Sequence, residues 1–257
     1  MVNDAAGGFV DYPMVEEGEA TGAVAAVYAE LLDRMPFVPS LWKSLALCPG
    51  YLVLAHEQAA PLLTDVSFRS RAQHLVSSVR EIAEPPADAE VRRALAQFAG
   101  PLSQMLLLAA GLRLALDGRL DVPPAPGRAP RPRPVQPRSP VPSTQVAPAP
   151  KICGEIRAAL ETPIVNTIWR TLAARGLLEA AWTGLGPQVT ATRPAGDGLR
   201  ESAYEAARQV SWQVAATPAA LERAGLGDAR PGMVSILDAY VTTLPRVLVL
   251  VASSTDL

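Results

Sequence analysis

The chain has 257 residues, 49% of them hydrophobic, and carries a formal net charge of −2 at pH 7. This length suits one large domain or two smaller ones, and the apolar fraction is ample for a sizeable core. A charge so close to zero creates no field that attracts nucleic acid or an anionic membrane, so we expect neither as a partner.

Three features of the sequence favour a cytoplasmic protein. The longest apolar stretch, 102–116, is interrupted by Gln104 and Arg113 and is shorter than a bilayer requires. The N-terminus lacks the basic-then-apolar run of a signal peptide. Cys48 and Cys153 lie far apart without paired spacing, which argues against a disulfide framework.

The sequence shows the periodicity of amphipathic helices. Apolar side chains recur at i, i+3, i+4 and i+7 from Tyr28 to Met35 and again from Leu95 to Leu102. We find no sustained run of alternating β-branched residues that would indicate strands. We predict an all-α fold with four or five helices in each half, and helix breaks at Pro36, Pro39, Pro49-Gly50, Pro85-Pro86, Gly118, Pro163, 194–198 and Pro231-Gly232.

Residues 121–150 separate the two halves and contain eleven prolines among thirty positions. Such a run cannot maintain helical hydrogen bonds or bury a core, so we predict an extended, disordered linker. Its four arginines are interpreted as solubilising charge, with contact to an acidic partner or RNA as the alternative. The chain is thereby divided into a helical repeat over 1–120, the linker over 121–150 and a second helical repeat over 151–257.

The two halves also resemble each other in sequence. The first half reads Pro-Phe-Val-Pro-Ser-Leu-Trp-Lys-Ser-Leu-Ala over 36–46, and the second reads Pro-Ile-Val-Asn-Thr-Ile-Trp-Arg-Thr-Leu-Ala over 163–173. Two copies of one unit commonly pack about a pseudo-two-fold axis, and we expect a ligand cleft between them. The equivalent pairs are Trp42 with Trp169, Lys43 with Arg170 and, after a one-residue gap, Gly50 with Gly176, His56 with Trp182 and Pro61 with Pro187.

These motifs resemble the group I 2-haloacid dehalogenases, which hydrolyse small 2-halocarboxylic acids and consist of two all-helical repeats with the active site between them. The second half is similar to the family's N-terminal repeat through 163–170 and the closing segment 237–240. The first half is similar to the C-terminal repeat through 38–42, 48–52 and 93–98. The resemblance implies that the two repeats occur in swapped order, as after circular permutation, which is feasible where domain termini lie close together.

The resemblance breaks at the residue that carries the family's chemistry. That family uses an aspartate as general base, placed just before the aromatic residue of a Pro-x-x-aromatic stretch. Here Leu41 holds the matching position, and Ile168 is its equivalent in the other copy. Neither side chain can accept a proton, and general-base assistance is worth roughly 10² to 10⁴ in rate. We therefore expect the fold to be retained and the dehalogenase chemistry to be lost.

Four polar residues are candidate catalytic groups. Ser40, Asn166 and Thr167 lie beside the lost acid or its equivalent, where they would donate hydrogen bonds to a carboxylate or carbonyl; helix capping is the alternative. His56 titrates near neutral pH and is a candidate acid or base, with a partly exposed helix position without any such role as the alternative.

The candidate substrate-binding residues are those that the repeat places around the cleft. For the two tryptophans, burial in the core is the alternative. Lys43 and Arg170 would neutralise an anionic substrate or, alternatively, lie on the surface paired with acids. The substrate-binding set is Leu41, Trp42, Ile168, Trp169 and Tyr240.

The motifs that are missing complete the functional interpretation. Two histidines and two isolated cysteines provide no metal-ligand spacing, and no glycine-rich phosphate loop occurs, so we expect no metal and no cofactor. We expect a biosynthetic enzyme of specialised metabolism that positions a small or medium organic ligand for cyclisation, isomerisation or elimination. The alternatives are a non-catalytic small-molecule binder and a dehalogenase that uses another acid, such as Asp65. A homodimer is left open.

Overall fold

The computed structural model describes residues 14–120, 150–213 and 215–255. All regular secondary structure within these ranges is helical, so the predicted all-α fold is confirmed. Residues 121–149 of the predicted linker lie outside the described ranges, and Pro150, the last residue of that segment, begins a helix.

The helices of the first half are α1 (Gly22–Leu32), α2 (Ser40–Leu45), α3 (Pro49–Ala59), α4 (Val66–Ser77) and α5 (Ala89–Leu116). Those of the second half are α6 (Pro150–Leu160), α7 (Thr167–Ala174), α8 (Leu178–Leu185), α9 (Val189–Arg208), α10 (Pro218–Arg223) and α11 (Arg230–Ala252). Short 3-10 helices occupy Leu62–Thr64, Gly186–Gln188 and Gly227–Ala229.

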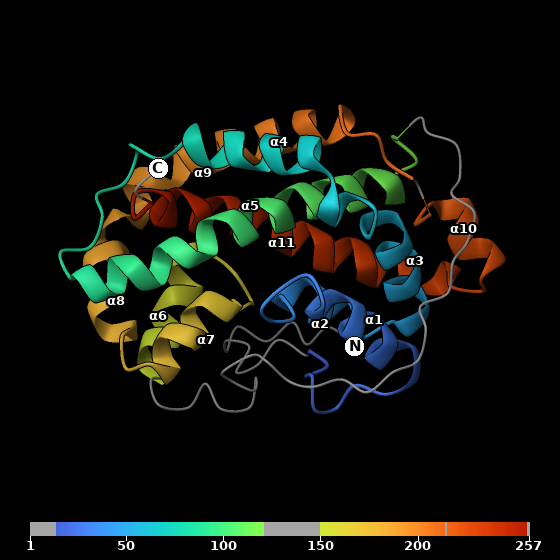
Figure 1. Ribbon diagram of the computed structural model, residues 1–257, viewed down its shortest axis with the longest axis horizontal. Coiled ribbons are helices and arrows are strands. Elements are labelled where there is room, and N and C mark those ends of the chain that lie inside the picture. The colour runs from blue at the N-terminus through green and yellow to red at the C-terminus, as the bar shows by residue number, and fades with distance from the viewer. Residues whose placement is uncertain (1–13, 121–149, 214, 256–257) are drawn as a thin grey trace.

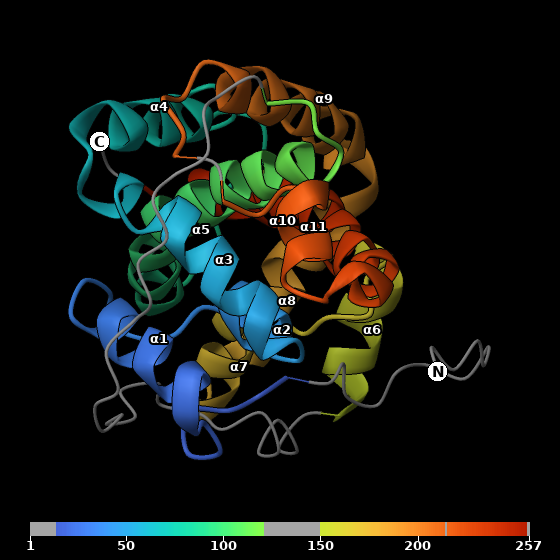
Figure 2. The same cartoon turned by 90° about the vertical axis from the view of Figure 1, so that its right-hand side faces the viewer.

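Two long helices form the centre of the molecule. α5 and α11 lie side by side, with α4 and α9 on one side of them and the short helices α1–α3 and α6–α8 on the other (Figures 1 and 2). Every residue of 105–112 in α5 and of 247–252 in α11 is buried. The core therefore follows these two helices and joins the two halves of the chain.

The two central helices are longer than the apolar stretches in them suggest. α5 begins at Ala89 because the carboxylate of Asp88 accepts hydrogen bonds from the backbone N–H groups of Glu90 and Val91.

By length and composition alone, α5 and the helical segment Gly227–Ala252 are apolar enough to cross a membrane. The prediction that no segment is long enough was therefore wrong. However, 72% of the most apolar window of each is buried inside the protein, and core helices of soluble proteins pass the same test.

The predicted helix break at 194–198 is also wrong. α9 continues from Val189 to Arg208 with Pro194 inside it. Gly196 approaches α11 so closely that an added Cβ would lie 3.0 Å from Cγ of Arg246. Packing on α11 therefore stabilises the helix, although the proline removes one of its hydrogen bonds.

An aromatic contact occurs in the same place in each half. The ring of Trp42 in α2 meets the ring of His56 in α3 edge-on, with centroids 6.2 Å apart. The ring of Trp169 in α7 meets Trp182 in α8 in the same way at 5.7 Å. These are the residues that the sequence comparison pairs, so the two aligned segments make equivalent contacts.

Candidate functional site

A small cavity lies where the N-termini of α2 and α7 meet the middle of α5 and α11. Its volume is about 30 Å³, which is room for roughly two or three water molecules. Its walls are mostly apolar, and the polar lining side chains come chiefly from the two short helices. The lining residues are Phe37, Pro39, Ser40, Leu41, Phe98, Pro101, Leu102, Met105, Asn166, Thr167, Ile168, Tyr240 and Leu244.

The two halves meet at this cavity through a pair of hydroxyl groups. Ser40 Oγ and Thr167 Oγ1 are 2.6 Å apart, and either can donate the hydrogen bond. The backbone N–H of Thr167 also donates to Ser40 Oγ at 2.9 Å. Because this N–H belongs to the first residue of α7, it has no partner within that helix. Ser40 therefore caps a helix of the other half and not its own.

Asn166 stands at the wall of the cavity without using its side chain to cap α7. It occupies the N-cap position, but it makes no side-chain cap hydrogen bond. Its Oδ1 and Nδ2 atoms are both buried and have no hydrogen-bond partner among the described residues. Leaving such a group unpaired costs on the order of 1–3 kcal/mol. The capping alternative is thus wrong for Asn166, whose buried side-chain amide makes no hydrogen bond to the described residues.

Three further sequence candidates line the cavity. Leu41 and Ile168 form part of its apolar wall and are each 1% exposed. Tyr240 of α11 also lines it, and its hydroxyl group lies 2.9 Å from Ser44 Oγ of α2 in a hydrogen bond. The structure thus brings together Ser40, Leu41, Asn166, Thr167, Ile168 and Tyr240 around one space.

The two tryptophans do not line the cavity. Trp42 and Trp169 are fully buried in the core, and the Nε1–H of each has no hydrogen-bond partner among the described residues. Their rings pack against α3 and α8 respectively. The core alternative therefore describes both residues better than the expected role in substrate binding.

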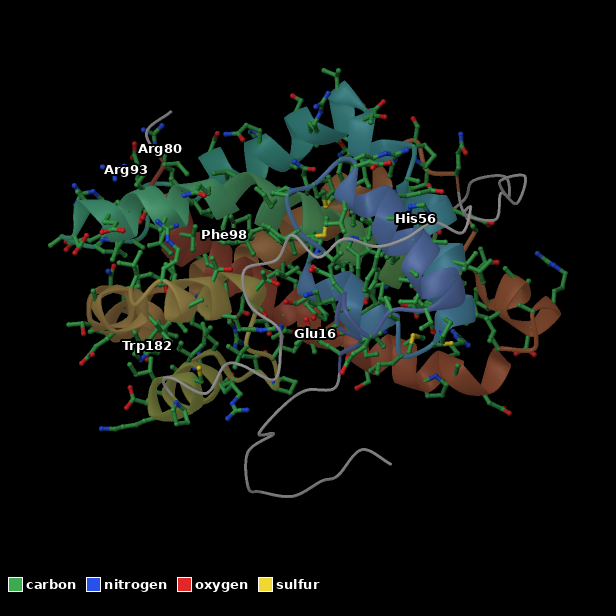
Figure 3. The ribbon with its side chains drawn as sticks, turned by 60° about the horizontal axis from the view of Figure 1, so that its bottom comes forward. Glu16, His56, Arg80, Arg93, Phe98 and Trp182 are labelled. Atoms are coloured by element: carbon green, nitrogen blue, oxygen red, sulfur yellow. The ribbon has the colours of Figure 1, made fainter. Side chains whose placement is uncertain are left out.

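His56, on α3 (Figure 3), is not among the residues that line the cavity. It is 3% exposed, so the expected partly exposed position is wrong. Burial lowers the pKa of His56 to about 4, because desolvation outweighs the raising effect of Glu30, whose Oε2 is 3.7 Å from Nε2. The imidazole is therefore neutral at pH 7, and it is placed to pack against Trp42 rather than to exchange protons with a ligand.

Lys43 and Arg170 are buried, which contradicts the surface position that was their alternative. The Lys43 Nζ atom lies 2.8 Å from Glu16 Oε2, and Arg170 Nη2 lies 3.0 Å from Glu16 Oε1. A second carboxylate, Glu17, approaches Lys43 at 3.4 Å. Glu16 lies where the helices of the two halves meet (Figure 3). These cations therefore neutralise carboxylates of the chain itself, and neither lines the cavity.

No described residue that lines the cavity is an aspartate, glutamate, histidine or lysine. Asp65, the alternative acid, caps α4, where its Oδ1 accepts hydrogen bonds from the Ser67 hydroxyl and the Phe68 N–H. These hydrogen bonds lower the pKa of Asp65. Its carboxylate is thus committed to a helix end outside the cavity. The described part of the chain also contains no cluster of three or more His, Cys, Asp or Glu residues that would hold a metal ion.

The sequence interpretation missed the contribution of the long helices to the cavity. Phe98, Pro101, Leu102 and Met105 of α5 line it, as does Leu244 of α11. The four α5 residues stand at i, i+3, i+4 and i+7, which is one face of a helix. The periodicity was therefore present in the sequence, but it does not distinguish a cavity wall from the core.

Comparisons with known proteins identify the class to which this fold belongs. Solved structures of D-2-haloacid dehalogenase share it: a mutant in complex with D-2-CPA superposes with a TM-score of 0.73 at 18% identity, covering 94% of each chain. A further mutant gives a TM-score of 0.74 at 17% identity over 93% of each chain. The dehalogenase with L-LA gives 0.70 at 18% identity over 94% of each.

The protein therefore has a dehalogenase-like fold, as the resemblance in sequence implied. No family model and no curated protein matches the sequence. At 17–18% identity the likeness establishes the fold, and the activity has to be argued from the cavity itself.

Proposed function

We propose that the cavity between the two halves binds a small organic molecule and that the protein is an enzyme whose reaction depends mainly on positioning, such as cyclisation, isomerisation or elimination. The observation that carries this proposal is that Ser40, Leu41, Asn166, Thr167, Ile168 and Tyr240, which come from both halves of the chain, line one mostly apolar cavity. A few polar groups in an apolar pocket orient a ligand. Positioning contributes up to about 7–11 kcal/mol in favourable intramolecular reactions.

The residues at the site argue against hydrolytic dehalogenation by the mechanism of the similar family. That reaction requires a base beside the attacking water, and Leu41 occupies the matching position as part of the apolar wall. Asp65 and His56 lie outside the cavity. A reaction that needs no strong base is therefore the better match to this site.

A non-catalytic small-molecule binder is the second candidate. It is favoured by the composition of the lining, which contains no Asp, Glu, His, Lys or Arg among the described residues. Multiple turnovers of a bound compound would support the enzyme, whereas stoichiometric binding without conversion would support the binder.

Two wider features complete the proposal. We place the protein in specialised metabolism, acting in the cytoplasm on a small-molecule ligand without a cofactor. We also propose that its two halves occur in swapped order relative to the family, with 121–150 as the junction. Cleavage within that segment should leave the halves associated, because the α5–α11 core joins them; separate elution of two folded halves would contradict this.

The direct test is to identify the compound that co-purifies with the protein and to measure its binding to variants of the cavity. Asn166→Leu keeps the number and branching of the side-chain heavy atoms but replaces the unpaired amide with two methyl groups. It should abolish or strongly weaken binding while leaving the melting temperature unchanged or higher, because an unpaired buried amide is destabilising. If stability and binding fall together, Asn166 is a structural residue and the proposal fails.

A second pair of variants distinguishes the effect of losing the Thr167 hydroxyl at the cavity from the general effect of replacing a threonine with alanine near the start of a helix. Thr167→Ala removes the hydroxyl that faces Ser40, and it should weaken binding far more than it lowers stability. Thr190→Ala, at an exposed position in the first turn of α9, is the matched control and should leave both unchanged.

A further inference from the structure

A broad groove between α6 and α8 shares no lining residue with the small cavity. Its volume is about 850 Å³, near the upper end of the roughly 300–1,000 Å³ that is typical of pockets for drug-sized molecules. The two helices pack together at one end of the molecule (Figure 1). Ile152 of α6 and Leu178 and Trp182 of α8 (Figure 3) form apolar parts of the wall. The groove is therefore large enough for several residues of an extended peptide.

A side chain crosses the equivalent place in the first half. Arg34, just after α1, donates a hydrogen bond from Nη1 to the carbonyl oxygen of Ala60 at the end of α3, at 2.7 Å. Ala60 lies four residues after His56. Gly186 lies four residues after the counterpart Trp182, and it lines the groove. The end of α3 is thus covered from α1, whereas the equivalent end of α8 is open.

Two carboxylates of the groove lack a counter-charge. Glu155 of α6 and Glu179 of α8 line it, both are exposed, and neither forms an ion pair with a described residue. Lys151 is the one cation among the described lining residues. Two carboxylates against one ammonium group give this lining a net charge of −1. The groove therefore favours a basic ligand over an acidic one.

The chain itself carries a basic segment that ends at the groove. Residues 121–149 lie outside the described residues, and the described chain resumes at Pro150 and Lys151, which both line the groove. The sequence of 122–149 contains ten prolines, four arginines and no acidic residue. Proline-rich peptides dock in aromatic-lined grooves because their extended conformation is preformed, and arginine binds carboxylates well. A tether at the groove also gives the segment an effective concentration on the order of millimolar.

We propose that this groove is the docking site of the chain's own proline- and arginine-rich segment, with 128–138 as the stretch that binds. Its arginines pair with Glu155 and Glu179, and its proline rings pack on the apolar wall that includes Trp182. The eleven residues of 139–149 span about 34 Å when extended, which is enough to turn back to Pro150. This inference does not depend on the small cavity, so it and the proposed function can fail separately.

Limited trypsin digestion of the full-length protein tests the docking. Trypsin cuts after Arg128 and Arg138 but is blocked at the other two arginines of the segment, because a proline follows each. Combining Glu155→Gln with Glu179→Gln should speed both cuts roughly fivefold, because two exposed ion pairs are lost, and should leave the melting temperature unchanged.

Two further double variants make this result specific. Glu201→Gln with Glu205→Gln removes the same charge from α9, at side chains that are 71% and 63% exposed, and should leave the cutting rates unchanged. Arg131→Gln with Arg133→Gln alters neither the groove nor the two cleavage sites, and it should speed the cuts as the groove variant does. If the groove variant and this segment variant are cut no faster than the unaltered protein, the proposal is overturned.

A synthetic peptide of residues 128–138 identifies the occupant. It should shift the indole NMR signal of Trp182 in a protein whose residues 122–149 are replaced by glycine and serine. It should not do so in the unaltered protein, where the groove is occupied. A peptide that binds both proteins equally, or neither, would contradict the docking. Protection from trypsin that rises with protein concentration would assign the groove to the segment of a second copy, and docking within one chain would be wrong.

Discussion

Replacing Glu16 with glutamine is expected to lower the free energy of unfolding by about 3 kcal/mol, near the lower end of the range for breaking a buried ion pair. The side chain of Glu16 is 7% exposed, and its two oxygens bind cations from opposite halves of the chain. Glutamine keeps the size and one acceptor oxygen but removes the negative charge. The variant therefore isolates the electrostatic contribution of this contact.

The expected loss of unfolding free energy depends on which carboxylate each cation still contacts in the variant. Lys43 still approaches Glu17 at 3.4 Å. Arg170 loses the carboxylate that binds Nη2 at 3.0 Å, and its side chain is only 3% exposed, so water compensates little. One partly compensated charge corresponds to a loss nearer 3 than 5 kcal/mol. For a chain of this size, that is a fall of roughly 6–12 °C in Tm.

Urea denaturation and calorimetry at pH 7 measure this loss. The control is Glu205→Gln in α9, where a side chain that is 63% exposed pairs with Arg208 at 3.0 Å. An exposed pair contributes less than about 1 kcal/mol. If Glu16→Gln costs no more than this control, the buried cluster does not join the two halves energetically and the reasoning is refuted.

Three further predictions concern packing, pH and chemistry. In α5, Gly111→Ala should destabilise the protein by about 1–3 kcal/mol, because its Cβ would lie 1.9 Å from Cζ2 of Trp212. Gly100→Ala in the same helix meets no atom within 4 Å and should stabilise by about 0.5–1 kcal/mol; equal effects in urea titrations would contradict this. The folded pKa of His56, about 4, lies below the ordinary 6.5, so the unfolded chain binds its proton first as the pH falls. Its contribution to stability is complete above pH 6.5 and is lost towards pH 4, with about 2 kcal/mol gone at pH 5; a His56→Gln variant with unchanged pH dependence of unfolding would oppose this. Purified protein should release no halide from 2-chloropropionate above background, and Leu41→Asp should create a titratable group in the cavity, visible by NMR. Turnover of the unaltered protein at an ordinary enzymatic rate, or an aspartate side chain that proves solvent-exposed, would show that the register is wrong.

Local sequence patterns were sufficient to predict the fold class. Apolar residues at helical spacing and the absence of alternating β-branched runs predicted an all-α protein, and the resemblance to the dehalogenases predicted the fold that the structural comparisons show. The segments around Ser40-Leu41 and Thr167-Ile168 were also chosen from sequence, and the structure brings them to one cavity. Such local patterns are legible because helix periodicity and proline breaks act within a few residues.

Which way the side chains of these helices face depends on how the whole chain packs, and it became known only from the folded structure. Trp42 and Ile168 are both apolar residues of short helices, yet one packs into the core and the other lines the cavity. Periodicity defines an apolar face, but not what lies against it. Asn166 shows the same limit, since its side-chain amide has no hydrogen-bond partner among the described residues, which the sequence alone does not reveal.

The charged residues show the clearest difference between what the sequence predicts and what the folded structure shows. Lys43 and Arg170 are of residue types that are usually found on the surface. No acidic residue lies next to either of them in the sequence to pair with a buried charge. Glu16 comes from a segment 27 residues before Lys43 and 154 before Arg170, yet it reaches both cations. A buried charge is stable only where a partner from elsewhere in the chain supplies the opposite charge. That partner is brought into place only when the whole chain has folded.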